Sequence, residues 1–388
     1  MTEKLYYSDS FLREFDAVVT GCEPAKKGWK ITLDRTAFYP EGGGQPTDKG
    51  VLTYGDTVVN ISEVHEKNGL LAHTADAEIP IGTKVHGEID WDRRFDLMQQ
   101  HTGDHMISGV ILSEYGYNNV GFHLTEKELV IDYDGVLTPS DTEHVIDVCN
   151  RRIWENNPIS ARYPQNVKEM DYRSKRDIDG DIRIVTVENV DVCACCGTHL
   201  KSTAQVGSII IYAQQSFNGG TRLFCACGGR ALAMLKKRNA DCYRISHLLS
   251  SPVDNVADAV VKKIKENESL KMSRSSLKRS MIEIWVERTK TDGELAVCVQ
   301  PGLDAADLAQ MSVMLGEKKA STAIAVSDGK ICIVSQSVDT NRLGRFIASH
   351  TGGKGGGKPG IYQGIVNSAP TAEQLTELYN EFKEDTQK

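Results

Sequence analysis

The sequence predicts an α+β protein in four parts: a small β-barrel over residues 1–90, an α+β core over 91–235, a basic helical linker over 236–290 and an α/β domain over 291–388. The first part alternates apolar and polar residues over short runs, as strands with one buried face do. The rest mixes strands and helices without the regular alternation of parallel-sheet proteins. At 388 residues, the chain is long enough for more than one buried core.

The barrel is predicted from three alternating runs with glycine-rich turns between them, at 15–19, 29–33 and 58–62. A helix is expected next, over 91–114, and it carries His101 and His105 together with Phe95 and Met98. We therefore expect both histidines to face the interior.

Further elements follow from capping and turn signals. A helix is expected to begin at Ser140, which has capping-box spacing to Glu143, and to end at Asn157. Strands are expected at 182–187 and 208–212, with a cysteine-rich segment between them. The C-terminal unit is expected to have strands at 295–299, 323–326 and 331–334, helices at 304–315 and 340–349, and a last helix capped by Thr371 and Gln374.

Basic residues are concentrated in the middle of the chain. From 230 to 290 there are fourteen Lys and Arg against seven Asp and Glu, so this stretch is near +7 and the rest of a chain of net charge -8 is near -15. A solvated helix face would explain the pattern, but a polyanionic partner is the sharper interpretation. Leu270, Leu277 and Ile284 lie seven residues apart, which favours an amphipathic linker over a short coiled coil; a homodimer through the linker or the C-terminal domain is compatible with this spacing.

The bulk composition excludes some classes of protein. A hydrophobic fraction of 40% and a charged fraction of 25% are typical of soluble proteins. No apolar run approaches the roughly twenty residues that span a bilayer, so no membrane partner is expected. The N-terminus lacks the pattern of a secretory signal, which predicts a cytoplasmic location. Five of the ten cysteines lie between Cys193 and Cys227, and in a reducing compartment such clustering favours metal binding over disulfides.

Two pairs of potential metal ligands stand out: His101 with His105, and Cys195 with His199. Each pair is spaced four apart, which on a helix puts both side chains on one face. A buried histidine alone is usually a hydrogen-bonded core residue, but imidazole and thiolate together indicate zinc rather than magnesium or calcium. We predict one zinc ion per chain, bound by these four side chains.

The pattern argues against a zinc protease of the His-Glu-x-x-His kind, because Thr102 occupies the place of the glutamate that would act as general base. Four protein ligands form a closed tetrahedron, whereas hydrolytic zinc keeps a position open. Displacement of the thiolate, or binding of the substrate as a fifth ligand, would reconcile four protein ligands with a hydrolytic role. Cys193 and Cys196 compete for the thiolate role, although neither has the four-residue step to His199.

The glycine-rich segment 38–50 is a candidate ligand loop. Gly43 and Gly44 let the backbone approach a ligand, and Gln45 and Asp48 can supply a donor and an acceptor. A tight strand connection is the alternative. The whole run favours a ligand loop.

A second glycine-rich segment, 352–359, contains Lys354 and Lys358. Exposed backbone amides with two lysines can hold phosphate. The segment is not a P-loop, because Pro359 follows the second lysine. A flexible surface loop is the alternative.

These motifs carry a family resemblance. His101-Thr-x-x-His105, Cys195-x-Gly-Thr-His199 and the loop from Phe38 to Gly50 resemble the editing domain of alanyl-tRNA synthetase and its free-standing relatives, the AlaX proteins, over roughly residues 10–235. The second glycine segment resembles the C-terminal domain that the synthetase shares with DHH-type phosphoesterases, but no Asp-His-His motif accompanies it. The whole chain looks like the long form of AlaX.

The resemblance implies a trans-editing hydrolase that deacylates tRNA(Ala) mischarged with serine or glycine. It implies catalytic roles for His101, His105, Thr36 and Gln45. Thr36 is the candidate for binding the serine hydroxyl, since a site that pairs this group rejects alanine by on the order of 1 to 3 kcal/mol. Zinc is expected to position the 3'-terminal adenosine and polarise the ester rather than to carry a standing hydroxide. Substrate contacts are expected from Thr36, Gly43, Gly44, Gln45, Asp48, Lys354 and Lys358.

The chain departs from the family's pattern at two places. Cys196 stands where a glycine is usual, and Gly103 with Asp104 fills the interior of the histidine motif. Two alternatives stay open: a catalytically inactive, zinc-stabilised module that binds tRNA or dimerises, and a zinc hydrolase that acts on a free small ester or amide.

Overall fold

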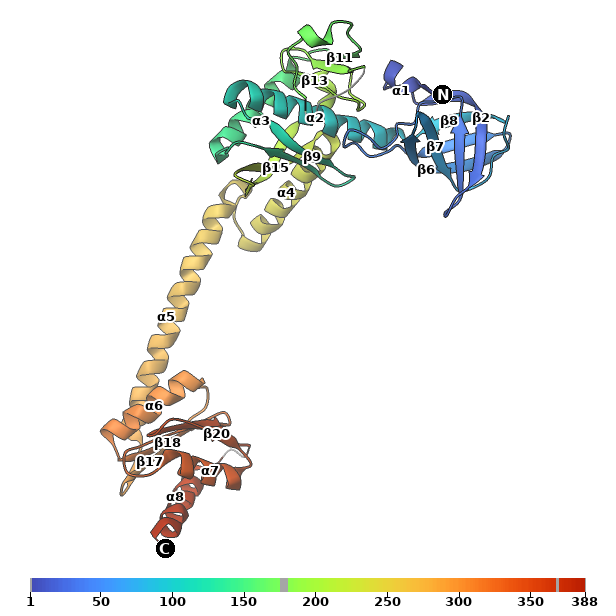
Figure 1. Ribbon diagram of the computed structural model, residues 1–388. Helices are drawn as coiled ribbons and strands as arrows, with labels where there is room; N and C mark the ends of the chain where they lie inside the picture. The colour runs from blue at the N-terminus through green and yellow to red at the C-terminus, as the bar shows by residue number, and fades with distance from the viewer. Residues whose placement is uncertain (1, 175–180, 368–369, 388) are drawn as a thin grey trace. The chain divides into compact units, whose positions relative to one another are not determined.

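The computed structural model describes residues 2–174, 181–367 and 370–387 (Figure 1). The chain divides into two compact units, Met1–Arg244 and Ile245–Lys388, and each is described by itself. The division into four parts with the boundaries given above stays a prediction. Among the described residues, no helix has the length and apolar character needed to cross a membrane.

A closed six-stranded barrel forms the N-terminal part, so the predicted barrel is confirmed. Its strands follow one another round the barrel in the order β2 (Glu14–Pro24), β3 (Trp29–Leu33), β7 (Leu70–Ala75), β6 (Thr57–Lys67), β5 (Gly50–Tyr54) and β8 (Lys84–Ile89). Alternate side chains point inward and fill the interior, among them Val19, Ile31, Leu52 and Val85. Before the barrel, β1 (Glu3–Lys4) pairs in parallel with β4 (Arg35–Thr36), and α1 (Leu5–Ser8) follows β1.

Helix α2 (Trp91–Tyr115) runs through the middle of the core, as the sequence predicts. Asp90 caps its start by accepting a hydrogen bond from the Arg93 amide, and Gly116 ends it in the left-handed conformation (φ 71°). Every residue from Leu97 to Ile111 is buried, because the helix packs against α3, β9, β13 and β15. Its polar residues therefore lie inside the protein and need internal partners.

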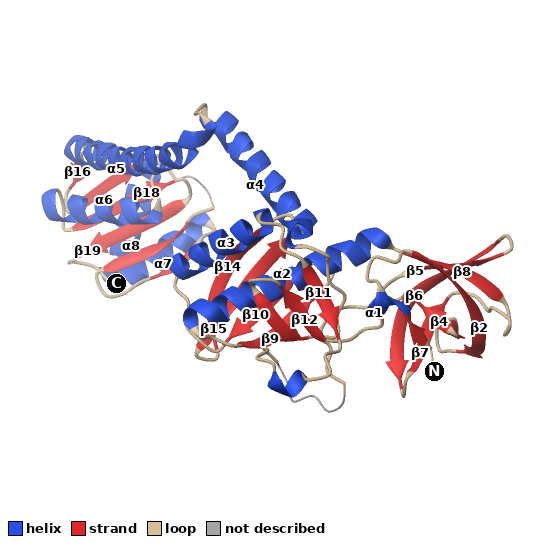
Figure 2. Ribbon diagram, turned by 90° about the horizontal axis from the view of Figure 1, so that it is seen from above, coloured by secondary structure: helices blue, strands red, loops and turns tan. Residues whose placement is uncertain are grey.

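Two sheets surround α2 (Figure 2). The larger has the order β14 (Ile209–Phe217), β15 (Gly220–Cys227), β10 (Leu129–Tyr133) and β9 (Asn119–Leu124); the smaller has β11 (Ile159–Arg162), β12 (Ile184–Val187) and β13 (Asp191–Ala194). Short 3-10 turns lie at Val167–Glu169 and Thr203–Val206.

The start of α3 (Pro139–Trp154) corrects one prediction. The capping box consists of Thr138 and Asp141, not Ser140 and Glu143. Pro139 explains the difference, since proline favours the first helical position and therefore sets the cap at the residue before it.

Helix α4 (Gly228–Leu249) begins in the first unit, and the 3-10 turn Val253–Asn255 and α5 (Val256–Arg288) belong to the second. The second unit has a six-stranded sheet in the order β16 (Thr291–Asp292), β17 (Leu295–Val299), β18 (Thr322–Ser327), β19 (Lys330–Ser335), β21 (Ile361–Ile365) and β20 (Lys354–Gly356). Among the described strands of this sheet, only β17 and β18 pair in parallel.

Helices cover both faces of this sheet. On β18, Ile324 and Val326 pack with α7 (Thr340–Thr351) and α8 (Ala372–Gln387), while Ala323 and Ala325 pack with α6 (Ala305–Lys318) and the end of α5. The predicted cap of the last helix is confirmed, because the Gln374 amide donates to Thr371 Oγ1 and the Thr371 amide to Gln374 Oε1.

Candidate metal centre

The structure brings together the four side chains expected to bind zinc. One ligand atom from each of His101, His105, Cys195 and His199 lies within 4.8 Å of the others. The Cys195 sulfur is 3.4 Å from His101 Nε2 and 3.3 Å from His199 Nε2. Zinc bonds of about 2.0–2.3 Å in a tetrahedron separate the ligand atoms by about 3.3–3.6 Å. The group therefore has the donors and the spacing that a zinc ion requires.

Helix α2 supplies the two histidines of the first pair from adjacent turns. Between them, Gly103 faces β15, and a Cβ atom there would lie 2.2 Å from the sulfur of Cys227. The helix can approach the sheet this closely only because position 103 lacks a side chain. This packing explains the glycine at position 103.

The second pair lies on a loop that follows β13. A Cβ atom on Gly197 would lie 2.2 Å from His101 Cε1, so only glycine allows the loop to lie against that ring. Arg183 holds the loop, since its Nη1 donates to the carbonyl oxygens of Cys195 (3.0 Å) and Gly197 (2.9 Å). The Gly197 amide donates to the Cys195 sulfur at 3.3 Å. Sequence reasoning missed Arg183, because no motif marks it.

Gln45 of the glycine loop orients His101. Its Oε1 lies 2.9 Å from His101 Nδ1 and also accepts from the Thr198 amide, while its Nε2 donates to Thr198 Oγ1 at 2.8 Å. Gln45 is fully buried. A ligand histidine usually donates its second ring nitrogen to such a partner, which leaves the other nitrogen for the metal.

His105 has a partner of the same kind that the sequence did not reveal. Its Nδ1 lies 2.9 Å from Asp191 Oδ2. The same carboxylate accepts from Arg173 Nε at 3.1 Å and Nη2 at 2.8 Å, and both side chains are buried. The third histidine, His199, has its Nδ1 3.3 Å from the hydroxyl of Thr102, the residue that replaces the protease glutamate. Each imidazole thus has a polar partner within 3.3 Å of Nδ1, which at His105 is a close carboxylate without hydrogen-bond geometry.

The three cysteines of this region differ in their surroundings. Burial would raise the pKa of Cys195, but the charges of the three histidines outweigh it and hold the pKa well below its ordinary range. Burial raises the pKa of Cys193 to about 12, and Cys193 lies instead beside His105 Nδ1 and Asp191. Cys196 is exposed as a residue, but its sulfur is partly shielded from solvent. This partial burial and the neighbouring Cys195 raise the pKa of Cys196. Among the described residues, only Cys195 joins the three-histidine group.

Thr36 is fully buried, and its hydroxyl is bound by the protein. His73 Nδ1 lies 3.0 Å from the Ile31 carbonyl oxygen, which can only accept, so this nitrogen carries the proton. Burial lowers the pKa of His73 to about 4, so its Nε2 accepts from Thr36 at 2.9 Å. The Phe38 amide donates to the same Thr36 oxygen at 3.1 Å. Thr36 can therefore offer a further partner only its remaining lone pair.

Asp48 is also fully buried, and it anchors the glycine loop to α2. Its carboxylate forms an ion pair with the guanidinium of Arg94 and accepts from the Tyr39 amide at 2.6 Å. The substrate contact expected of Asp48 would require this buried pair to open. Such an opening is costly, because it leaves a charge without its partner.

Gly43 and Gly44 have positive φ angles of 59° and 78°, which glycine adopts readily. A Cβ atom on Gly44 would lie 2.5 Å from the ring of Phe122, which in turn stacks on His101 at 5.0 Å between ring centroids. A cavity of about 720 Å³ lies between this loop and β9, and Gly44, Gln45 and Phe122 line it. Phe122 and Gln45 together cover His101 on the side of this cavity.

Lys354 and Lys358 belong to the second unit, whose placement relative to the metal group is not defined. Lys354 begins the edge strand β20 and is exposed. Gly353, Gly355 and Gly357 lie close to the carbonyl groups of β21, where a Cβ atom would come within 1.9 to 2.4 Å of an oxygen. Glycine is therefore needed at these positions so that the edge strand β20 can pair with β21.

Three segments match known families. Residues 4–93 match the family described as tRNA synthetases class II (A), residues 182–224 the threonyl and alanyl tRNA synthetase second additional domain, and residues 292–388 the DHHA1 domain. Two of these matches contain parts of the candidate centre, the glycine loop and the Cys195–His199 loop.

Whole proteins are similar as well. The chain is 28% identical to the alanyl-tRNA editing protein AlaX-L of Pyrococcus horikoshii, with 95% of this chain and 96% of the relative covered. It is 26% identical to the alanyl-tRNA editing protein Aarsd1 of Mus musculus, with 96% of each covered. It is 30% identical to an alanine–tRNA ligase of Ignicoccus hospitalis, with 92% of this chain but 40% of the ligase covered. The chain thus spans about two fifths of the ligase and nearly the whole of the two editing proteins.

Proposed function

We infer that this chain, which belongs to the alanyl-tRNA editing proteins of the AlaX-L kind, is an aminoacyl-tRNA deacylase. The observation that carries the inference is the group of three histidines and Cys195, with a polar partner beside Nδ1 of every imidazole. Because a purely structural zinc could use the same four ligands, the similarity to editing proteins over nearly the whole chain favours the deacylase. The group lies where the glycine loop of the barrel meets the loop after β13, so both segments contribute to one site.

We propose zinc as the metal, one ion per chain. Nitrogen and sulfur donors at tetrahedral spacing suit zinc better than they suit magnesium or calcium. When bound, zinc would polarise the ester and hold the terminal ribose. Gln45, Asp191 and Thr102 keep the three imidazoles oriented for this role.

The proposed substrates are tRNA(Ala) esters of serine and glycine. Thr36 is our candidate for recognising the serine hydroxyl. The hydrogen bonds of Thr36 determine whether its oxygen donates to serine or accepts from it. Because Thr36 donates to His73, its oxygen can accept a hydrogen bond from the hydroxyl of serine. Alanine has no such donor and would leave this remaining lone pair of Thr36 unused.

The test is deacylation of Ser-tRNA(Ala) and Ala-tRNA(Ala) by the zinc-loaded protein. We expect the seryl ester to be hydrolysed far faster, and His105→Ala to lose this activity because it removes a ligand. His86→Ala is the matched control, since His86 is an exposed histidine of the barrel with only surface carboxylates as partners. If zinc-loaded wild-type protein leaves both esters to decay at the rate of buffer alone, the chain is a non-catalytic module instead.

A further inference from the structure

The candidate metal centre opens to solvent on one side. The three histidines are buried, and Cys195 is the partly exposed member of the group. On the side of the 720 Å³ cavity between the glycine loop and β9, Phe122 and Gln45 cover His101. Cys195 is therefore the least buried of the four ligands.

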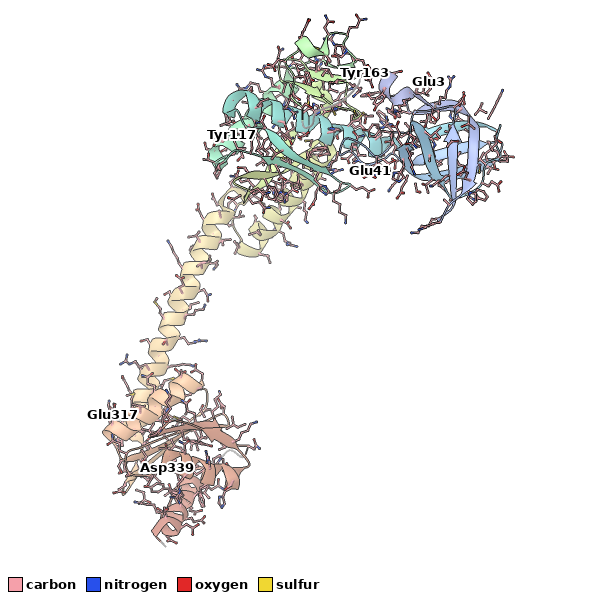
Figure 3. The ribbon with its side chains drawn as sticks, in the orientation of Figure 1. Glu3, Glu41, Tyr117, Tyr163, Glu317 and Asp339 are labelled. Atoms are coloured by element: carbon pink, nitrogen blue, oxygen red, sulfur yellow. The ribbon has the colours of Figure 1, made fainter. Side chains whose placement is uncertain are left out.

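Two tyrosines flank this open side. Tyr7 of α1 is half-buried, and Tyr163 is 52% exposed. Figure 3 labels Tyr163, which lies directly after β11. The two ring centroids lie 6.4 Å apart with the rings nearly perpendicular. Arg183, which donates to the backbone carbonyls of Cys195 and Gly197, lies against the Tyr7 ring. The pair is thus linked through Arg183 to the loop that carries Cys195.

A cavity lies between Tyr7 and the metal ligand His199. It measures about 120 Å³ and is lined by α1, β11 and the ligand loop, including Tyr7, Arg183 and His199. The guanidinium of Arg183 lies 5.1 Å from the Tyr7 ring centroid and keeps that ring in place. Tyr6 also lines the cavity, and its buried hydroxyl has no hydrogen-bond partner within the described chain.

We propose that Tyr163 and Tyr7 form a stacking platform for the unpaired 3'-terminal nucleotides of the tRNA, with Tyr163 under a base that precedes the terminal adenosine. The proposal rests on the deacylase function. If the ester lies at the metal, the terminal ribose lies there too, and the preceding bases must cross the neighbouring surface. Proteins bind unpaired bases by stacking them on aromatic side chains.

Charge is the weaker contribution at this surface. Lys4 lies 2.7 Å from Glu66, and Lys201 lies 3.1 Å from Asp9, so both nearby lysines are already paired. Lys4 and Arg183 already lie 5.7 and 5.1 Å from the Tyr7 ring centroid, so Tyr7 mainly supports Tyr163, whose 52% exposed ring offers the surface for a base. We therefore assign the recognition to the rings and expect it to tolerate different bases.

The test compares two substrates in the full-length, zinc-loaded protein: Ser-tRNA(Ala), and adenosine esterified with serine at its ribose, which lacks the preceding nucleotides. We expect Tyr163→Ala to raise KM for the tRNA about tenfold with little change in kcat, and to leave the adenosine ester and the zinc content unchanged. Tyr163→Phe should behave as wild type, because it keeps the ring. Trp154→Ala is the matched control, since Trp154 is a 77% exposed aromatic residue on α3 of the same unit.

The outcomes separate the platform from the deacylase function. Equal effects of Tyr163→Ala on both substrates, or no effect on either, would overturn the platform while wild-type activity still supports the deacylase. A loss of zinc in Tyr163→Ala would show a structural role and overturn it too. If the wild-type protein hydrolyses neither substrate, the deacylase function is wrong and the platform is wrong with it.

Discussion

A single histidine shows how context decides chemistry in this chain. His73 is fully buried, as the three histidines of the metal group nearly are, yet it lies on β7 inside the barrel and bonds only protein atoms. Burial lowers its pKa to about 4, so it stays neutral and accepts from Thr36. The position of the Thr36 hydroxyl, and with it the proposed recognition of serine, depends on this neutral ring.

We expect His73 to make the barrel less stable in mild acid. The pKa of His73 is about 4 in the native barrel, below its ordinary value of about 6.5. As pH falls through this range, His73 becomes protonated in the unfolded chain but stays neutral in the native barrel. Stability should therefore drop between pH 6.5 and 4 by up to about 3 kcal/mol, with no further loss from this group below that window. Hydrogen exchange of the β3 amides measures the stability of the barrel, and His73→Gln should reduce the slope of this stability against pH. His86→Gln should not: Asp16 raises the pKa of His86, which has the opposite sign. An unchanged slope in His73→Gln would contradict the assignment.

At the scale of elements, the sequence predicted those strands, helices and caps that depend on residues close together in the chain. The barrel strand β3 and helix α2 lie where alternation and helical spacing put them, and the last helix has its predicted cap. Asp191 and Arg173 could not be predicted, because they meet His105 only after β13 packs against α2. The roles of Gln45 and Asp48 also depend on partners far away in the chain, Thr198 and Arg94.

The loop after β13 gives a prediction at this scale. Gly197→Ala should lower metal affinity about tenfold to a hundredfold, because a Cβ atom would lie 2.2 Å from His101 Cε1 and would move the loop away from that ligand. Competition with a zinc chelator measures the affinity. Gly229→Ala is the control, since its nearest contact outside the adjacent chain would be an ordinary 3.9 Å to Gln99. If both variants hold zinc as the wild type does, the close approach of Gly197 to His101 is not needed for metal binding.

At the scale of the whole molecule, charge is unevenly distributed along the chain. The chain carries -8 in total, while residues 230–290 carry near +7, and most of that stretch lies in α4 and α5. Lysines 262, 265 and 271 are exposed on α5, where a solvated helix face and a tRNA contact would look alike. Salt dependence distinguishes the two, because only contacts with phosphate release the counterions of the nucleic acid.

We therefore expect the triple variant Lys262→Gln, Lys265→Gln and Lys271→Gln to bind tRNA more weakly and to flatten the plot of log Kd against log salt by as much as about 2. Zinc content and hydrolysis of the adenosine ester should not change, because α5 belongs to the other compact unit. The matched control replaces three exposed lysines of the barrel, 26, 27 and 30, with glutamine. It removes the same charge, so a general effect of net charge would alter both variants equally. Equal slopes in the two variants would mean that the basic helix is only a solvated face and that tRNA is held elsewhere.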